Sequence, residues 1–380
     1  MEKVLLTTVF SGYNYGSSLQ ALATKTILKE LGYDCRLVAM KSLVKGRDIR
    51  IKKLMTILIR SWLIRGKNGT NALSTYKGSY NKVMIGDSVT RFEKFTNEYL
   101  EPQYLSWNSM KRLAKECVSC FAGSDQIWNS STMYVDPMYY LRFAPAEKRI
   151  AFAPSFGRDF VAEYNKKKMS KWISEFACLS VREDSGIKLI KELTGRDAIH
   201  LIDPTLMVKG ETWKKILSLQ DKQGNYILTY FLDKPSESAR RAIAELKETL
   251  KCEVIAIPYQ FDDMGYCDKV VPTGPIEFLD LINNAKCVLT DSFHGTAFSI
   301  NLHTPFYVFG RNYGTAHSQN SRIESILKMM NMQDRFEQKD IVGQLKAINF
   351  EVSEQILSDE RNKSRNYIIN TINGRNCKNN

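Results

Sequence analysis

The sequence lacks the features that define several large classes of protein. It contains no run of 18 or more apolar residues, which is what a membrane-spanning helix requires. Its start, Met1 to Lys3 followed by a short strand-like apolar run, has neither the charged leader and long apolar stretch nor the cleavage site of a signal peptide. We therefore expect a cytoplasmic protein with reduced thiols.

Metal-binding and nucleotide-binding signatures are also missing. Only Cys117 and Cys120 have the CxxC spacing, and no second pair completes a zinc site, so no metal is expected. The loop after the first predicted strand lacks the spacing of a dinucleotide-binding fingerprint or a phosphate-binding P-loop. No recognised nucleic-acid-binding module is present. We therefore expect neither a bound cofactor nor a nucleic acid partner.

What is present is a long basic chain in which predicted strands and helices alternate. A length of 380 residues favours two domains, and the net charge of +13 favours anionic partners. The alternation predicts parallel sheets of the α/β class. The predicted division is an N-terminal α/β domain over residues 1–208, a C-terminal α/β domain over 222–345 and a closing helix over 351–375.

Residues 41–66 stand apart from this alternation. The segment is rich in Lys and Arg and carries a dense set of apolar residues from Ile51 to Ile64, with Trp62 among them. One interpretation is a helical excursion packed on the first domain. The other is a surface helix that rests on an anionic membrane, which suits an enzyme whose acceptor is carried on a lipid. The sequence leaves both open.

Polar residues closely follow the predicted strands of both domains. In parallel α/β sheets, ligands bind at the carboxyl ends of the strands. The residues in such places are Asn14, Gly16, Ser17, Ser124, Asp125, Gln126, Ser155, Arg182, Asp291, Ser292 and His294. A cleft between two such domains would bring both sets to one place. In the loop at Asn14, Gly16 and Ser17, a helix N-terminus either binds an anionic group or forms a plain capped turn.

A second candidate segment packs a carboxylate, two amides and an indole into one short turn. Its residues are Ser124, Asp125, Gln126, Trp128 and Asn129. Polar groups of this kind bind sugar hydroxyls, and an aromatic face suits the apolar face of a sugar ring. The carboxylate of Asp125 can also act as a general base on a hydroxyl. The alternative is a hydrogen-bonded turn with Trp128 in the core.

The second domain contributes a histidine in a chain that has only four. His294 follows a predicted strand, precedes Gly295 and opens a helix. An imidazole in this position can donate a proton near neutral pH or, when charged, bind phosphate. His200 and His303 are expected to be structural. For His317, a structural role and a functional role both stay open.

Three arginines are candidates for binding a carboxylate or a phosphate, because a guanidinium makes two-pronged bonds to such groups. Arg311 and Arg322 lie near the ends of predicted elements in the second domain, and Arg182 follows a strand of the first. The alternative for Arg311 and Arg322 is a solvated surface charge. For Arg182 it is an internal pair with Glu183 or Asp184.

Seven short motifs occur in a recognisable order along the chain. They are NYGSSLQAL (14–22), GSDQIWN (123–129), APSFG (153–157), SVRE (180–183), DPTL (203–206), TDSFHGTAFS (290–299) and SRI (321–323). Together they resemble the polysaccharide pyruvyl transferase family, over about residues 1–335. The resemblance implies a fold similar to GT-B glycosyltransferases, with two Rossmann-like α/β domains and a central cleft.

The resemblance also implies a reaction. Pyruvate would pass from phosphoenolpyruvate, as co-substrate, to a sugar of a bacterial cell-surface glycan precursor, such as an exopolysaccharide or capsule, giving a ketal and free phosphate. The acceptor would be carried on a lipid or a nucleotide, and the protein would be cytoplasmic or peripheral at the inner face of the cytoplasmic membrane. His294 would be the acid or a phosphate ligand and Asp125 the acceptor-side base. The anion clamps would be Arg182, Arg311 and Arg322.

One position departs from the family pattern, and two other functions fit the same residues. Many family members carry an arginine two residues before this histidine, where this chain has Ser292. Either Arg311 or Arg322 supplies the charge, or the donor differs. A GT-B-like glycosyltransferase with a nucleotide-sugar donor is the main alternative, because fold does not set function. A non-catalytic glycan- or membrane-binding protein is the other, although binding alone does not require His and Arg groups from both domains.

Overall fold

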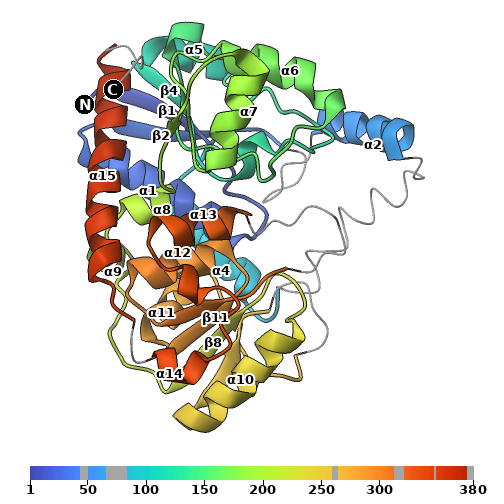
Figure 1. Cartoon of the computed structure of the whole chain (residues 1–380). Coiled ribbons are helices and arrows are strands. Elements are labelled where there is room, and N and C mark those ends of the chain that lie inside the picture. The colour runs from blue at the N-terminus through green and yellow to red at the C-terminus, as the bar shows by residue number, and fades with distance from the viewer. Residues whose placement is uncertain (43–49, 66–83, 259–263, 312–320, 346–347, 375–380) are drawn as a thin grey trace. The chain divides into compact units, whose positions relative to one another are not determined.

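The computed structural model describes the chain except for residues 43–49, 66–83, 259–263, 312–320, 346–347 and 375–380 (Figure 1). His317 and parts of the predicted excursion at 41–66 lie outside the described residues. The chain divides into two compact units. Unit 1 comprises residues 1–78, 96–207 and 360–380, and unit 2 comprises residues 79–95 and 208–359.

Unit 1 is built on a five-stranded parallel sheet with the order β3-β2-β1-β4-β5. The central strand β1 has four consecutive buried residues, as is typical of a parallel strand covered on both faces. The strands are β1 (Lys3–Thr7), β2 (Asp34–Met40), β3 (Gln103–Leu105), β4 (Ser119–Ala122) and β5 (Arg149–Ala151), with a separate parallel pair, β6 (Ser180–Val181) and β7 (Ile199–His200).

The helices of unit 1 connect these strands. They are α1 (Tyr15–Glu30), α2 (Ile51–Arg65), α5 (Trp107–Glu116), α6 (Glu163–Ser174), α7 (Asp184–Thr194), α8 (Pro204–Met207) and the larger part of α15 (Glu351–Ile372), with the short turns η1 (Thr96–Leu100), η2 (Gln126–Trp128) and η3 (Ala146–Lys148). α1 returns the chain from the end of β1 to β2, which lies beside β1 in parallel register from Lys3 opposite Asp34.

Unit 2 repeats this plan with the order β10-β9-β8-β11-β12, again entirely parallel. Its strands are β8 (Tyr226–Tyr230), β9 (Glu253–Ala256), β10 (Lys269–Val270), β11 (Cys287–Thr290) and β12 (Phe306–Val308). Its helices are α4 (Ser88–Phe95), α9 (Gly210–Leu217), α10 (Glu237–Leu250), α11 (Pro275–Asn284), α12 (Phe293–Asn301), α13 (Ser321–Met329) and α14 (Ile341–Leu345), with the turn η4 (Gln333–Arg335).

Each sheet has one point where the direction of strand addition reverses. In unit 1 the reversal falls between β1 and β4, and in unit 2 between β8 and β11. Ligands of open parallel sheets bind outside the carboxyl ends of the strands at this switch point. The two parallel sheets, each with its own apolar core, confirm the predicted α/β class.

The division of the chain differs from the sequence-based one in two segments. Residues 79–95 were predicted in the first domain but group with unit 2. Within unit 2, Ser88 Oγ accepts a hydrogen bond from the buried Thr273 N–H at 3.0 Å, and Arg91 pairs with Glu277 at 3.0 Å. The two ends of α15 also belong to different units, with the boundary at Glu360. Sequence periodicity shows that a helix exists but not which core it packs on.

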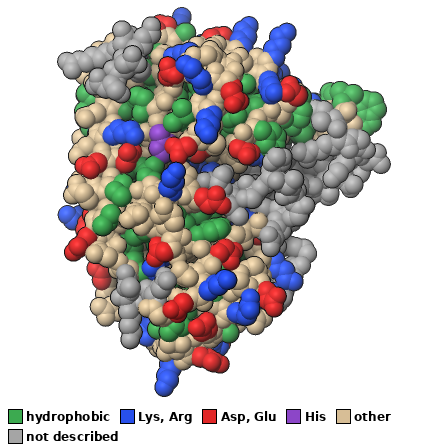
Figure 2. All heavy atoms as spheres, in the orientation of Figure 1, with side chains coloured by type: hydrophobic (Ala, Val, Ile, Leu, Met, Phe, Trp, Pro, Cys, Tyr) green, Lys and Arg blue, Asp and Glu red, His purple; other side chains and the backbone are tan. Residues whose placement is uncertain are grey.

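The cysteines, the hydropathy of the helices and the charged side chains on the surface remain to be described. Cys178 is disulfide-bonded, contrary to the expectation of reduced thiols, whereas the six other cysteines in the described part of the chain are free. Spacing rules detect cysteines that are close in sequence and miss those that folding brings together. Among the described residues, no helix is both long enough and apolar enough to span a bilayer. Figure 2 shows Lys, Arg, Asp and Glu side chains interspersed over the visible face.

We expect Ser88→Ala to lower the free energy of unfolding of unit 2 by about 1–3 kcal/mol, because it removes the acceptor of the buried Thr273 N–H. Urea denaturation measures this change. Thr90→Ala, which removes an exposed hydroxyl from the same helix, is the control and should cost less than about 0.5 kcal/mol. Equal costs for the two variants would contradict the docking of α4 on unit 2.

Candidate functional site

The switch point of unit 1 joins the start of α1 to the loop after β4. Asn14 is the N-cap of α1, and its side-chain oxygen accepts the Ser17 N–H at 3.0 Å. The Ser17 hydroxyl donates to Asp125 Oδ2 across the switch point. Gly16 and Ser17 are buried, whereas Asn14 is half-buried at the rim. The sequence-predicted residues of these two loops therefore lie together.

Asp125 is fixed through its backbone as well as its side chain. Its φ of +66° is one that L-residues rarely adopt, and its carbonyl accepts the Ser155 N–H at 2.8 Å. An isolated parallel bridge to Pro154 extends the β4–β5 pairing to this point. The side chain keeps 13% of its surface exposed. Asp125 is thus a rigidly placed carboxylate that a ligand can still reach.

A buried charge network lies beneath Asp125. The Arg182 guanidinium pairs with Asp203 and lies 3.7 Å from Asp125 Oδ1. Burial by itself lowers the pKa of Arg182, but the three neighbouring carboxylates more than offset this effect and hold the pKa above its usual value. The Arg182 side chain is only 2% exposed. Arg182 therefore orients Asp125 from below, and its charge is already balanced by carboxylates before any anion arrives.

Sequence reasoning missed Asp203 as a site residue and named Glu183 only as a possible partner of Arg182. Asp203 Oδ2 also accepts the Ser124 hydroxyl at 3.1 Å. Glu183 Oε1 accepts the Ser155 hydroxyl at 3.0 Å and the Phe156 N–H at 2.7 Å. Both acids directly follow short predicted strands, so the strand-end rule that selected Ser124 and Ser155 would also have selected them.

The two predicted amides of the β4 loop bond to each other. Asn129 Nδ2 donates to Gln126 Oε1 at 3.0 Å, and both side chains are half-buried. Gly157 has a φ of +68°, and a Cβ there would lie 2.6 Å from the same Gln126 oxygen. A glycine at 157 therefore gives the Gln126 side chain the room to take this position.

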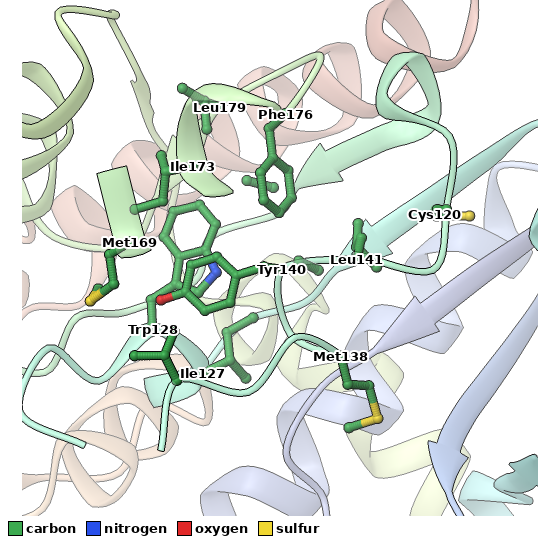
Figure 3. Close-up of a cluster of buried hydrophobic side chains, with 14 of the residues drawn as sticks. Cys120, Ile127, Trp128, Met138, Tyr140, Leu141, Met169, Ile173, Phe176 and Leu179 are labelled. Carbon is green, nitrogen blue, oxygen red and sulfur yellow. The ribbon is translucent and has the colours of Figure 1, made fainter. Parts of the chain in front are cut away.

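The prediction that Trp128 presents its face to a sugar is wrong. The indole is completely buried among Tyr140, Phe156 and Phe176, with ring centroids 5.3–5.7 Å apart (Figure 3). Its Nε1–H donates to the Tyr139 carbonyl at 3.3 Å. The 3-10 turn that follows Asp125 directs the indole inward, so Trp128 anchors the loop to the core of unit 1 instead of contacting a ligand.

In unit 2 the corresponding place is the junction of β11 and α12. Ser292 is the N-cap of α12, and its Oγ accepts the Gly295 N–H at 3.3 Å. A Cβ on Gly295 would lie 2.6 Å from Thr290 Oγ1, so glycine lets α12 pack closely on the end of β11. Ser292 and Gly295 shape the helix N-terminus, which offers N–H groups and a partial positive charge to an anion.

His294 is the one side chain in residues 291–300 that is not fully buried. It belongs to the first turn of α12, with its ring edge-on to Phe293 at a centroid distance of 5.2 Å. His303, by contrast, is half exposed and pairs with Glu354 at 3.5 Å. His294 is therefore partly accessible at the start of α12, although its Nε2 atom is buried.

Asp291 joins the two sides of the switch point in unit 2. Its carboxylate accepts the N–H groups of Leu232 at 2.6 Å and Asp233 at 2.9 Å, which follow β8. Burial raises the pKa of Asp291 to about 6, although the Arg311 charge and the two backbone bonds oppose the shift. Asp291 thus holds the loop after β8 in place and is itself covered.

The two candidate arginines of unit 2 are both buried. Arg311 Nε donates to the Asp291 carbonyl at 2.9 Å and lies 3.5 Å from Asp291 Oδ2, so its guanidinium is at the carboxyl end of β11. Arg322 is in α13. Neither is the solvated surface charge that the sequence left open. Within the described part of the chain, no group of three or more His, Cys, Asp or Glu residues has the arrangement of a metal site.

Comparison with known proteins decides the family. The family model for polysaccharide pyruvyl transferase matches residues 14–313, which contain every candidate residue described above except Arg322. The chain belongs to the polysaccharide pyruvyl transferase family. The family membership indicates a transferase that acts on polysaccharide.

Individual relatives are more distant. This chain is 25% identical to general stress protein 30 of Bacillus subtilis over 276 residues, which cover 66% of this chain and 77% of that protein. Similar solved structures include a putative UDP-N-acetylglucosamine 2-epimerase from Listeria monocytogenes (11% identity, 97% of this chain and 95% of the other, TM-score 0.48). Another is a UDP-GlcNAc 2-epimerase from Neisseria meningitidis (10% identity, covering 98% of this chain and 99% of the other, TM-score 0.48). Identities this low transfer no activity.

The buried Asp291 should make the stability of unit 2 depend on pH. A pKa raised to about 6, against 3.8 for the ordinary carboxyl, means that the folded state holds its proton more tightly than the unfolded chain. The stability that unit 2 gains from this tighter proton binding is complete below about pH 4 and is lost as the pH rises through about 6. It amounts to about 3 kcal/mol at most.

Denaturation of the wild type and of Asp291→Asn at several pH values between 4 and 8 measures this contribution. The asparagine variant also loses a hydrogen-bond acceptor, so the comparison is of the slopes with pH and not of absolute stabilities. We expect a shallower decline between pH 4 and 6 in the variant. Parallel curves would show that Asp291 is ionised throughout this range.

Proposed function

We propose that the protein transfers pyruvate from phosphoenolpyruvate to a sugar of a cell-surface glycan precursor, such as one for exopolysaccharide or capsule, and that the product is a ketal. The observation that carries this proposal is the N-terminus of α12 in unit 2. There a half-buried histidine, His294, opens a helix whose N-cap is Ser292, and the Arg311 guanidinium lies at the same strand end. A proton donor, a helix N-terminus and a cation are what an enol phosphate requires.

The chemistry assigns a task to each of these groups. His294 protonates the methylene carbon of phosphoenolpyruvate, which leaves an oxocarbenium-like centre at C2. The helix N-terminus binds the dianionic phosphate, and Arg311 binds the carboxylate or phosphate. Because Arg311 lies beside Asp291, next to Ser292, it is our candidate for the cation that many family members carry at the position of Ser292.

The acceptor half of the reaction is assigned to unit 1. Asp125, oriented by Ser17 and Arg182, accepts the proton of the attacking sugar hydroxyl. The hydroxyl oxygen bonds to C2, and the C2–O bond to phosphate then breaks. A second hydroxyl closes the ketal. Of the two hydroxyl protons, one replaces the proton that His294 gave to the methyl group and the other leaves with phosphate, so the reaction balances without a metal or redox cofactor.

The surroundings of Asp125 favour a sugar as the acceptor. Asn14, Gln126 and Asn129 are half-buried amides that can bond to hydroxyls at the rim of the same loops. Ser124 and Ser155 are fully buried and bond to Asp203 and Glu183. We assign these two serines a supporting role below the binding surface. The acceptor sugar would be carried on a lipid or a nucleotide.

We expect His294→Ala to reduce acceptor-dependent release of phosphate from phosphoenolpyruvate by about 10²–10⁴-fold, because it removes the proton donor. A phosphate assay with a panel of glycan acceptors measures this rate. His303→Ala is the control, since His303 lies on the surface of the same unit, and should keep full activity. Thermal unfolding confirms that both variants fold.

Two outcomes would contradict the proposal. Full activity of His294→Ala would remove this histidine from the mechanism. Turnover with a nucleotide sugar and none with phosphoenolpyruvate would instead establish a glycosyltransferase, which the same fold class can support.

A further inference from the structure

Helix α2 contacts the rest of unit 1 through the side that carries Arg60 and Ser61. Arg60 donates to the Met133 carbonyl at 3.3 Å and to Asn165 Oδ1 at 3.1 Å, and its guanidinium lies 5.9 Å from the centre of the Tyr164 ring. Ser61 is buried on this attached side. In Figure 1 the helix extends outward from the rest of unit 1, near α6.

The opposite side of α2 exposes a stripe of large apolar residues. We call the five residues Ile51, Met55, Ile59, Trp62 and Leu63 the α2 stripe; each is 53–66% exposed. At about 100° per residue, these positions fall within an arc of about 120° on one helix face. They are five of the eight large hydrophobic residues that are exposed in the described part of the chain. Figure 2 shows the corresponding hydrophobic group at the outer end of the molecule.

The charge of the protein is concentrated in the same segment of sequence. Residues 41–83 contain eleven Lys and Arg residues and one acidic residue, Asp48, a net charge of +10 out of +13 for the whole chain. α2 itself contains four basic residues and no acidic one. Lys52, which falls within the same arc of the helix, is exposed. The apolar stripe therefore belongs to the most basic segment of the sequence.

An apolar stripe together with basic charge matches one kind of partner. A helix that lies in the plane of an anionic bilayer buries its apolar face among the acyl chains while Lys and Arg contact the headgroups, and Trp favours this interface. A nucleic acid would satisfy the charges but leave Ile51, Met55 and Ile59 in water. A second copy of this chain would bring two positive fields together, which disfavours self-association through this face.

We propose that α2 is a membrane-binding helix, and that the α2 stripe inserts into the surface of a bilayer containing anionic phospholipid. The helix lies along the membrane plane, because none of the described helices is apolar and long enough to cross it. The exposed Lys52 contacts the headgroups, and a basic residue near an anionic surface adds about 1 kcal/mol or less of attraction. This proposal does not depend on the reaction that the protein catalyses.

Co-sedimentation of the full chain with lipid vesicles tests the proposal. We expect binding to vesicles of mixed phosphatidylglycerol and phosphatidylcholine, and at least about tenfold weaker binding to phosphatidylcholine alone. Raising the salt from about 0.1 M to about 1 M should weaken the binding, since the Debye length falls from about 10 Å to about 3 Å. Equal binding to both kinds of vesicle, or none to either, would overturn the proposal.

Variants locate the contact. We expect the double variant Ile59→Glu with Trp62→Glu to lose at least about tenfold in affinity for the anionic vesicles. The control is Val352→Glu, which places one such carboxylate at another exposed apolar residue, 51% exposed in α15, and should bind as the wild type does. Because all three residues are exposed, these substitutions should leave the melting temperature unchanged within about 2 °C.

Two further results separate the bilayer from other partners. The fluorescence of the wild type should shift to the blue on anionic vesicles, and Trp62→Phe should bind but lose most of this shift, because the other four tryptophans lie elsewhere in the chain. If the double variant bound vesicles normally but changed the sedimentation coefficient of the free protein, the stripe would be an interface between copies, and the proposal would be wrong.

Discussion

In a parallel sheet the carboxyl ends of all strands fall on one edge, and the backbone groups that leave the sheet there must find partners. At the switch point of each unit, a carboxylate accepts hydrogen bonds from a neighbouring loop. In unit 1, Asp125 receives the Ser17 hydroxyl from the start of α1. In unit 2, Asp291 receives two N–H groups from the loop after β8. The candidate sites are built around these two acids, because each one ties the loops on either side of the reversal together.

The two carboxylates differ in what lies beside them, and this difference suits two roles. Asp125 keeps part of its surface exposed and is supported from beneath by a buried guanidinium. Asp291 is almost completely covered, and the groups that remain available beside it are the imidazole of His294 and the start of α12. The proposed reaction therefore assigns the acceptor hydroxyl to Asp125 and the anionic donor to the start of α12.

Features of the fold and the site that depend on local sequence could be predicted, whereas those that depend on contacts with distant residues could not. Strand ends are local, so the polar residues that follow β1 and β4 were expected at one edge of the sheet, and Ser17 and Asp125 do meet there. Glu183 and Asp203 obey the same rule but were not selected as site residues. The direction of the Trp128 side chain was predicted wrongly, because the 3-10 turn that buries it depends on the positive φ of Asp125. Neither that turn nor the core that receives the indole is visible in a short motif.

Features that depend on tertiary packing could not be predicted. α4 precedes most of unit 1 in the sequence yet packs on unit 2, because its partners Thr273 and Glu277 are about 185 residues away. The apolar residues of α2 occur around most of the helix, so the sequence left open whether the helix packs or binds a membrane. The contacts of Arg60 show which side is attached and thereby which apolar residues are left exposed.

The central claim is that an acid in this protein protonates the methylene carbon of an enol phosphate and that a sugar then captures C2. The most direct test is NMR of the glycan product formed in D2O from phosphoenolpyruvate labelled with carbon-13 at C2. The account predicts a labelled ketal carbon that carries a singly deuterated methyl group, with one phosphate released for each ketal. A product without the label, or labelled pyruvate released while the glycan stays unchanged, would contradict it.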